Sequence, residues 1–327
     1  MFAMVFDDVC GAADAVQSPV TAGASADRGA IFFLGDPLST LDTEWDSSLR
    51  LMEAHRRRGE EATWVSFDDI LIRNRTLFLG GVRVGPKDAV WLRLDPSNSV
   101  RWYETIRALC HVDAHIVNPP ETVLTVHDKR SALGFSPRCS WSVFSGRQLD
   151  QAIGEMRRLA IETAVLKPPS LFGSKGVSFL PVGDEAAIRR AFDELLPLFG
   201  YVILEPYLGP GGDEPPPDTR VLMTSRRVLG VIERLIPPGG GWHEVKRGGP
   251  LTATQGRLVA EVRAFLEARG ILLAGLDFIG DSLTEVNVSC PGAIPEINMF
   301  CDVVAEDLIV EDFWSVHDAS PAAPAGI

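Results

Sequence analysis

The chain has 327 residues, of which 46% are hydrophobic and 23% charged, and its formal net charge at pH 7 is −13. This length suits one large domain or two to three small ones with the composition of globular proteins. The negative charge disfavours general nucleic-acid binding, and no run approaches the roughly 18 apolar residues of a membrane span. The five cysteines include no CxxC pair. Neither a disulfide framework nor a structural zinc site is therefore expected, and a cytoplasmic location fits.

Both ends of the chain differ from its body. The first 30 residues are rich in Ala, Gly, Ser and Asp without a clear period, and their apolar start, MFAMVF, is too short for a secretory signal. We expect residues 1–30 to form a disordered extension and residues 316–327 a flexible tail. The body is predicted to divide into an N-terminal domain at 31–125 and two further subdomains at 126–200 and 201–315.

Strands and helices alternate in the segment 31–125. Apolar runs that stop at Gly, Pro or charged residues predict buried strands, and apolar residues at helical spacing predict amphipathic helices. In chain order the sequence predicts a strand at 31–35, a helix at 46–58, strands at 62–67 and 89–93, a helix at 100–110 and a strand at 115–118. This order indicates an open α/β sheet. Ligands of such sheets bind where strands end, which directs attention to Asp36, Arg93, Asp95 and Asn118.

The α/β pattern continues through the rest of the body. In 126–200 the sequence predicts helices at 128–133, 149–161 and 185–199 and strands at 140–144, 164–167 and 177–181. In 201–315 it predicts strands at 201–205, 219–224 and 228–235, a helix at 251–269 and a hairpin of 272–279 with 283–288 around Gly280-Asp281. The fold class predicted for the whole body is α/β.

Lysine is rare in this chain, with five residues among 31 basic ones, so each lysine is informative. Lys167 ends an apolar strand, where its ammonium group is suited to phosphate oxygens; an exposed strand end explains it equally well. Glycines in the following loop, 169–176, allow backbone N–H groups to surround a phosphate, but a plain β-turn is as good an interpretation. The chain has neither a Walker A motif nor a GxGxxG fingerprint, which argues against a P-loop NTPase and a dinucleotide dehydrogenase.

The strongest group of polar residues lies in the predicted hairpin. Glu285 and Asn287 are two positions apart on one strand, so their side chains leave the same face, and Asp277 on the preceding strand can point to it. Two carboxylates and an amide are hard oxygen ligands that suit a Mg²⁺ ion bound to phosphates. A solvated polar sheet face is the alternative. The apolar neighbours imply burial instead, and buried carboxylates need a cation.

The histidines and cysteines carry no catalytic pattern. No HxxxH pair occurs, and Ser289-Cys290 lacks the G-x-S-x-G elbow of a nucleophile. We expect Cys290 to be a packed or substrate-lining residue.

In order, these features resemble the ATP-grasp superfamily, and within it the prokaryotic glutathione synthetases. The likeness runs from about residue 31 to residue 312, and its most specific block is GLDFIGDSLTEVNVSCPGAIPEI. Further similar segments are DP…DSS…EAHRRRG, LRLDP around Arg93, and HIVNPP. The resemblance implies an ATP-grasp fold with an N-terminal α/β substrate domain, a small lid subdomain and a C-terminal subdomain that binds ATP and metal.

The resemblance also implies roles for residues at matching positions. Residues implied to bind ATP are Lys129, Lys167, Gly173, Ser174, Gly176, Glu205, Pro206, Tyr207, Leu208 and Asp218. Residues implied to bind two Mg²⁺ ions, or Mn²⁺ in their place, are Asp277, Glu285 and Asn287. Residues implied to act in catalysis, near the transferring phosphoryl group and the acyl phosphate, are Arg220 and Arg234. Residues implied to hold the substrate are Asp46, Ser47, Ser48, Arg93, Ser289 and Cys290.

The activity implied is ATP-dependent ligation of a carboxylate to an amine through an acyl phosphate, in a homo-oligomer, either a dimer or a tetramer. Glutathione formation from γ-glutamylcysteine and glycine is one hypothesis. A ligase for another small-molecule acid and amine is the second, because the predicted lid, residues 237–249, reads Trp242-His243-Glu244 where the family has Arg-Gly-Asn. The hinge reads Glu205-Pro206 where Gln-Asn is more usual. A nucleotide-binding regulatory protein without catalysis is the third, and the complete charged set argues against it.

Overall fold

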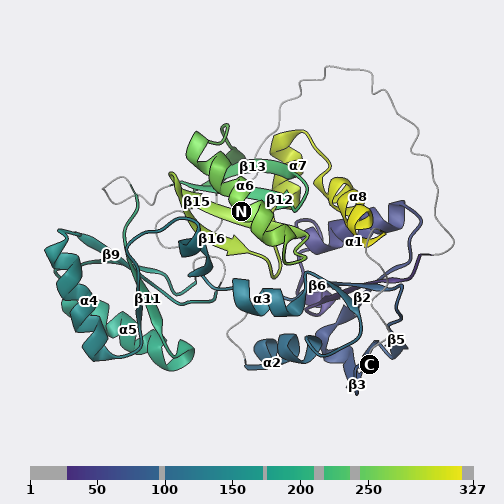
Figure 1. Ribbon diagram of the computed structural model, residues 1–327, viewed down its shortest axis with the longest axis horizontal. Helices are drawn as coiled ribbons and strands as arrows, with labels where there is room; N and C mark the ends of the chain where they lie inside the picture. The colour runs from purple at the N-terminus through teal and green to yellow at the C-terminus, as the bar shows by residue number, and fades with distance from the viewer. Residues whose placement is uncertain (1–27, 96–99, 172–174, 210–216, 236–243, 319–327) are drawn as a thin grey trace, which may run out of the picture.

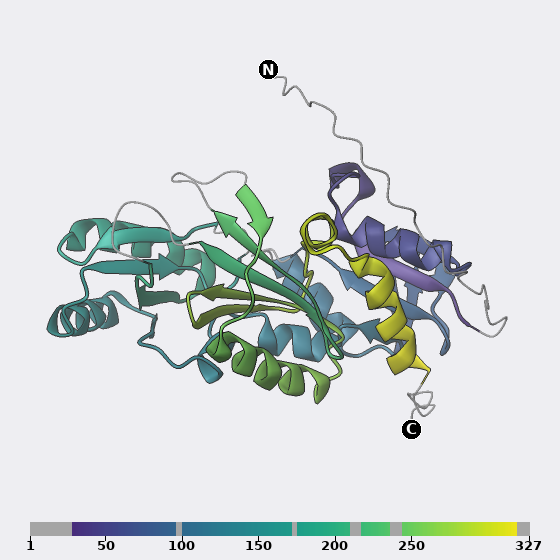
Figure 2. The ribbon, with the colours of Figure 1, turned by 90° about the horizontal axis from the view of Figure 1, so that it is seen from above.

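The computed structural model of the chain describes residues 28–95, 100–171, 175–209, 217–235 and 244–318 (Figure 1). Most of the predicted N-terminal extension and C-terminal tail lies outside the described residues, as do Gly173, Ser174 and residues 237–243 of the predicted lid. Figures 1 and 2 show an elongated molecule in which three sheets with their helices follow one another.

The predicted open sheet of the N-terminal segment is confirmed. Its strands are all parallel and lie in the order β2 (Ala62–Ser66), β1 (Ile31–Gly35), β6 (Ala89–Arg93) and β7 (His115–Val117). Helices cover both faces, which explains why β1 is an unbroken apolar run. Phe33 packs in the cluster that contains residues of α1 (Ser47–Arg57) and α8 (Ala305–His317). Leu34 packs in the cluster that contains residues of α2 (Val100–Leu109) and α3 (Pro120–Val126).

A small antiparallel sheet is inserted between β2 and β6. Its strands are β3 (Ile70–Arg73), β4 (Thr76–Leu79) and β5 (Val82–Arg83). The chain reverses at Asn74 with φ 57° and at Gly80 and Gly81 with φ 55° and 80°, where a left-handed backbone is required. These turn residues join the three strands into one small sheet.

The second sheet is antiparallel and forms the left end of Figure 1. Its strands lie in the order β10 (Ser178–Pro181), β9 (Thr163–Lys167), β11 (Val202–Pro206) and β8 (Trp141–Val143). Helices α4 (Gly146–Arg158) and α5 (Glu185–Phe199) contribute Leu149 and Phe192 to its core. The domain boundary between residues 200 and 201 stays a prediction. Strand β11, which follows this boundary in the chain, pairs with β8 and β9 in the second sheet.

The third sheet lies between the other two. Its strands are antiparallel in the order β14 (Glu244–Arg247), β13 (Val228–Leu235), β12 (Asp218–Thr224), β15 (Leu273–Ile279) and β16 (Ser282–Asn287). The predicted hairpin is confirmed as β15 and β16. Helix α6 (Ala253–Glu267) covers one face, as Figure 2 shows. Helix α7 (Ile294–Cys301) packs on β13 at the other face. Residues of α7 and β13 belong to the same hydrophobic core as residues of β1 in the first sheet.

Asn118 joins the first sheet to the third. Its side-chain amide donates to the carbonyls of Leu273 at 2.8 Å and Val288 at 2.7 Å, and its oxygen accepts from the N–H groups of Leu272 at 2.8 Å and Leu273 at 3.2 Å. Asn118 was singled out as a residue at a strand end that faces a ligand. Its amide is instead committed to these buried main-chain groups.

Other differences are local. The helix predicted at 128–133 is the 3-10 helix η3 (Ser131–Gly134), and further 3-10 turns are η1 (Leu38–Thr40) and η2 (Phe67–Asp69). The sequence pattern predicts neither α7 nor α8, although α8 packs against α1. Among the helices that the structure describes, none is long and apolar enough to span a membrane.

Candidate active site

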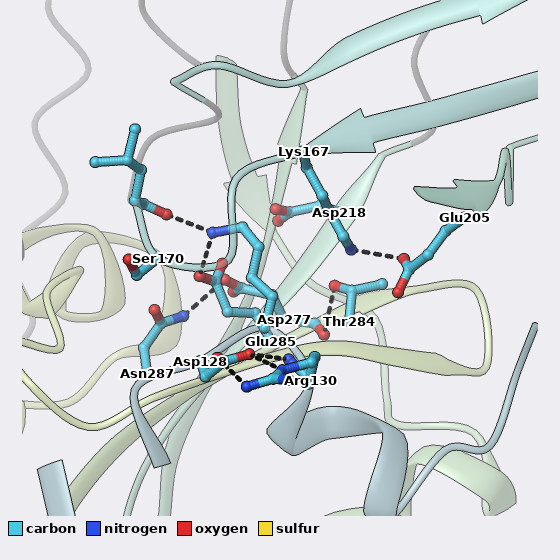
Figure 3. Close-up of polar contacts among 12 residues, drawn as sticks. Asp128, Arg130, Lys167, Ser170, Glu205, Asp218, Asp277, Thr284, Glu285 and Asn287 are labelled. Atoms are coloured by element: carbon cyan, nitrogen blue, oxygen red, sulfur yellow. Dashed lines mark hydrogen bonds and ion pairs between the residues drawn. The ribbon is translucent and has the colours of Figure 1, made fainter. Parts of the chain in front are cut away.

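The three predicted metal ligands meet on the β15–β16 hairpin. Asp277 lies opposite Glu285, and Gly275 lies opposite Asn287. The Asn287 amide donates to Asp277 Oδ2 at 2.9 Å, and both side chains lie on one face of the sheet (Figure 3). Asp277 is buried with 4% of its surface exposed. The two-residue spacing therefore gives the shared face that the sequence predicted.

Two arginines surround the Asp277 carboxylate. Arg220 on β12 lies opposite Asp277 and binds it through Nε and through Nη2, the latter at 2.8 Å from Oδ2. Arg234 on β13 donates through Nη2 to Asp277 Oδ1 at 2.8 Å and through Nε to Asp218 Oδ1 at 2.7 Å. Gly275 leaves room for Arg220, because a Cβ there would lie 3.0 Å from Arg220 Nη1. The cluster pairs two guanidinium groups with two carboxylates.

The electrostatics of this cluster keep Asp277 ionised. Burial by itself raises the pKa of Asp277, but the charges of Arg220 and Arg234 outweigh it and lower the pKa to about 2. Burial and the charge of Asp277 raise the pKa of Asp218 despite its ion pair with Arg234. Asp277 is thus the carboxylate that stays anionic under all ordinary conditions.

The donor set of the hairpin fits a magnesium ion. Two carboxylates and an amide oxygen are hard ligands, and they converge without a thiolate or imidazole among them. Among the described residues, no three His, Cys, Asp or Glu side chains lie close enough together to hold a metal ion. The hairpin set contributes two carboxylates, and its third member is an amide. The remaining oxygens would come from phosphates and water, which is the usual manner of Mg²⁺ binding.

The two predicted phosphate lysines lie beside the hairpin. Lys129 follows α3, and its Nζ contacts the Leu171 carbonyl and Glu285 Oε1, the latter at 3.0 Å. Lys167 ends β9, and its Nζ lies 2.6 Å from Glu205 Oε2 (Figure 3). Burial lowers the pKa of Lys167, and the Glu205 carboxylate acts against that effect. Both ammonium groups are therefore held by carboxylates between the second and third sheets.

The predicted hinge leaves β11 at the edge of this cluster. Glu205 is buried, and its carboxylate also accepts from Arg138 Nη2 at 3.2 Å. Pro206 ends the strand, and Tyr207 N donates to the Thr163 carbonyl at 3.0 Å, with Leu208 next in the chain. Arg138 was missed by the sequence analysis, because a single arginine in a Ser-Pro-Arg segment gives no signal.

The loop that the sequence offered as a phosphate cradle is described only in part. Gly176 has φ 72°, and a Cβ there would lie 3.3 Å from the ring of Pro168. Both facts make glycine the fitting residue at this position.

The six predicted substrate residues lie together where the segment after β16 crosses the end of the first sheet. Asp46 caps α1 by accepting from Ser48 N at 2.7 Å, and Ser47 Oγ accepts from Ile294 N at 3.2 Å. Arg93 is buried, donating from Nε to Ser48 Oγ at 2.9 Å and from Nη2 to the Pro291 carbonyl at 2.9 Å. These polar groups hold the first sheet against the C-terminal segment.

Ser289 and Cys290 complete the substrate group. Ser289 Oγ donates to the Leu94 carbonyl at 3.3 Å, and Cys290 Sγ lies 3.6 Å from the Arg93 carbonyl. Burial raises the pKa of the Cys290 thiol to about 12. This thiol is neutral and a poor nucleophile, as the sequence interpretation of a packed cysteine requires.

A pocket of about 330 Å³ lies to one side of the cluster. Its walls come from α2, from the segment around Lys129 and from the end of α5, and include Tyr103, Asp128, Ser170 and Tyr201. None of the predicted site residues that the structure describes lines it. We place the candidate site at the convergent charges, because those groups carry the chemistry.

His127 yields a pH prediction. Its side chain is buried beside Trp102, its Nε2 has no hydrogen-bond partner, and burial lowers its pKa to about 4. The unfolded chain takes up this proton near pH 6.5 and the folded chain only near pH 4. The free energy of unfolding should therefore fall as the pH drops from about 6.5 to about 4, by at most about 1.4 kcal/mol per pH unit.

The measurement is urea unfolding of the wild type and His127→Leu at pH 7.5 and pH 5. The wild type should lose about 2 kcal/mol more than the variant on acidification. Equal losses would show that His127 is protonated in the folded protein.

Comparison with known proteins adds the family. The family described as "Prokaryotic glutathione synthetase, ATP-grasp domain" matches residues 150–302, and "Prokaryotic glutathione synthetase, N-terminal domain" matches residues 30–84. A glutathione synthetase of Parasynechococcus marenigrum is 26% identical over 316 residues, covering 87% of this chain and 98% of the relative. One from Synechocystis is 28% identical over 310 residues, covering 81% and 93%.

Solved structures show the same fold. D-alanyl-alanine synthetase A from Vibrio cholerae aligns with a TM-score of 0.65 at 13% identity, covering 89% of this chain and 99% of that one. A D-cycloserine synthetase aligns with a TM-score of 0.63 at 17% identity, covering 86% of this chain and 100% of that one.

Proposed function

Since this chain is a glutathione synthetase-like ATP-grasp enzyme, an ATP-dependent ligase, we propose that it joins γ-glutamylcysteine to glycine, giving glutathione, ADP and phosphate through an acyl phosphate. The choice of substrates is supported by the similar glutathione synthetases, and one observation carries the ATP-dependent chemistry. Two arginines and two lysines converge on three carboxylates and an amide at the junction of the second and third sheets.

The nucleotide is proposed to lie between these two sheets. The ammonium groups of Lys129 and Lys167 bind its phosphates, and the main chain at Pro206–Leu208 forms hydrogen bonds with the adenine. Glu205, which precedes this segment, is paired with Lys167. Asp218 lies at the edge of this space, paired with Arg234. Gly176 is proposed to bind phosphate as well, together with Gly173 and Ser174, which lie outside the described residues.

Asp277, Glu285 and Asn287 are proposed to hold Mg²⁺, with two ions in all and Mn²⁺ as a substitute. When bound, the metal neutralises the negative charge of the transferring phosphoryl group. Asp277 is ready for this role because its carboxylate is already anionic. Arg220 and Arg234, which hold Asp277 through their N–H groups, are proposed to bind phosphate oxygens as well.

Activation of the acid follows from these charges. A carboxylate is a poor electrophile, so its oxygen takes the γ-phosphoryl group and ADP leaves. The guanidinium groups of Arg220 and Arg234 stabilise the charge that spreads over the phosphoryl oxygens and then over the tetrahedral oxyanion. The amine nitrogen attacks the acyl carbon, phosphate leaves with the C–O bonding electrons, and the amine loses a proton. Water has to be excluded while the acyl phosphate exists.

Asp46, Ser47, Ser48, Arg93, Ser289 and Cys290 are proposed to line the acid and amine sites. Their side chains are tied to one another and to the main chain, so they shape a rigid wall. A second candidate is ligation of another acid and amine. The sequence of the predicted lid favours it, because Trp242-His243-Glu244 stands where the family resemblance implies Arg-Gly-Asn. A cytoplasmic homodimer or homotetramer is the proposed assembly.

Phosphate release from MgATP by the purified chain tests the function, with γ-glutamylcysteine and glycine added singly and together. We expect release only when both are present, together with glutathione detected by mass spectrometry. Binding of ATP without stimulated release would contradict the glutathione assignment and support the second candidate. Neither binding nor release would contradict ligase activity itself.

A further inference from the structure

Glu205 is shared by two cations from different parts of the chain. Its Oε2 lies 2.6 Å from Lys167 Nζ, and Arg138 Nη2 lies 3.2 Å from Oε1 and 3.4 Å from Oε2. The exposed fractions of the three side chains are 5% for Glu205, 9% for Lys167 and 7% for Arg138. The sequence assigned no role to Arg138, and its contact with Glu205 arises only in the fold.

The charges of this triad do not balance. Two buried cations face one buried carboxylate, so one positive charge remains without a counter-charge inside the group. Lys129 adds a repulsion that further lowers the pKa of Lys167. A buried excess charge is costly unless an opposite charge approaches it. The group is therefore suited to receive an anion, and Lys167, at the end of β9, is the cation that the nucleotide proposal places against phosphate.

Arg138 also reaches the third sheet. Its Nη1 donates to the Leu283 carbonyl at 2.8 Å and to the Ser136 carbonyl at 3.4 Å. Leu283 lies on β16, the strand that carries Glu285 and Asn287. One guanidinium group thus links the hinge strand β11 to the strand of the proposed metal ligands.

We propose that Arg138 is a positioning residue of the nucleotide site, which neutralises Glu205 so that Lys167 is free to exchange its carboxylate for a phosphate oxygen. When the phosphate arrives, Arg138 keeps Glu205 paired, and no buried carboxylate is left alone. Its bond to Leu283 fixes the distance between the hinge and the metal strand during this exchange. This inference rests on the nucleotide site of the proposed function, but not on the identity of the acid or the amine.

Nucleotide affinity is the measurement, made by calorimetry with MgADP and with MgATP on the full chain without other substrates. Arg138→Met leaves Glu205 with Lys167 as its only partner, so the carboxylate competes with phosphate. We expect affinity to fall by about tenfold or more. In a chain that already carries Glu205→Gln the competing carboxylate is absent, so adding Arg138→Met there should lower affinity by no more than about threefold. Arg138→Lys, which keeps a cation, should also stay within about threefold.

The matched control is Arg189→Met, which breaks the exposed ion pair of Arg189 on α5 with Asp150 on α4 and should leave affinity unchanged. A purely structural Arg138 would lower the melting temperature without changing nucleotide affinity, and that result overturns the inference. If Arg138→Met does not fold, Arg138→Gln takes its place, with and without Glu205→Gln. A loss of tenfold or more that disappears in the Glu205→Gln background supports the inference, and an equal loss in both backgrounds overturns it. A wild type that binds no nucleotide contradicts the proposed function as a whole.

Discussion

Replacing Asp277 by asparagine is expected to lower ATP-dependent turnover on the order of 10³-fold. The change keeps the shape of the side chain but removes the charge that two arginines hold in place. Without it, the proposed metal loses an anionic ligand, and Arg220 and Arg234 lose the group that orients them. Glu285→Gln should have an effect of the same order, because it removes the second carboxylate. Phosphate release from MgATP with saturating acid and amine measures both.

Asp281 supplies the control on the same hairpin. It lies in the turn and accepts a hydrogen bond from Thr252 Oγ1 at 2.6 Å, away from the charge cluster. Asp281→Asn should keep turnover within about twofold, as an exposed surface change does. If Asp277→Asn and Glu285→Gln both retain turnover, the assignment of these residues to the metal is wrong. Circular dichroism of each variant separates lost chemistry from lost folding.

The second large effect concerns stability. Asn118→Ala is expected to lower the free energy of unfolding by about 3–5 kcal/mol. The substitution removes both partners of the Leu273 main chain and the partners of Leu272 and Val288, all of them buried. Buried main-chain groups without partners carry their full desolvation penalty. Denaturation in urea, followed by tryptophan fluorescence, measures the loss.

Two further variants sharpen this test. Asn118→Asp keeps the size and the acceptor but cannot donate to the two carbonyls, and we expect a loss similar to that of alanine. Thr122→Ala removes a single exposed contact to the Arg269 carbonyl at the same interface, 3.2 Å long, and should cost less than about 0.5 kcal/mol. A small effect of Asn118→Ala would mean that water replaces the amide, and the joint between the first and third sheets would then be weaker than its hydrogen bonds indicate.

Local pattern was sufficient for most elements of the fold. The apolar run Ile31–Gly35 and the two-residue spacing of Glu285 and Asn287 are properties of a few neighbouring residues, and the strand geometry that follows from them is the same in any sheet. The hairpin around Gly280 was predictable for the same reason. The 3-10 geometry of η3 and the helices after residue 288 were not, since their form depends on what they pack against.

The sequence by itself determined the α/β class, the open first sheet and the carboxylate-amide face of the hairpin, because hydrophobic period and side-chain alternation act over short distances. Only the tertiary structure decided that Asn118 binds main chain rather than a ligand, that Arg220 and Arg234 hold Asp277, and that Arg138 reaches Glu205 across 67 positions of the chain. These contacts join residues whose separation along the sequence carries no period. Their partners are selected by the register of strands and by the cost of leaving a buried charge or amide without one.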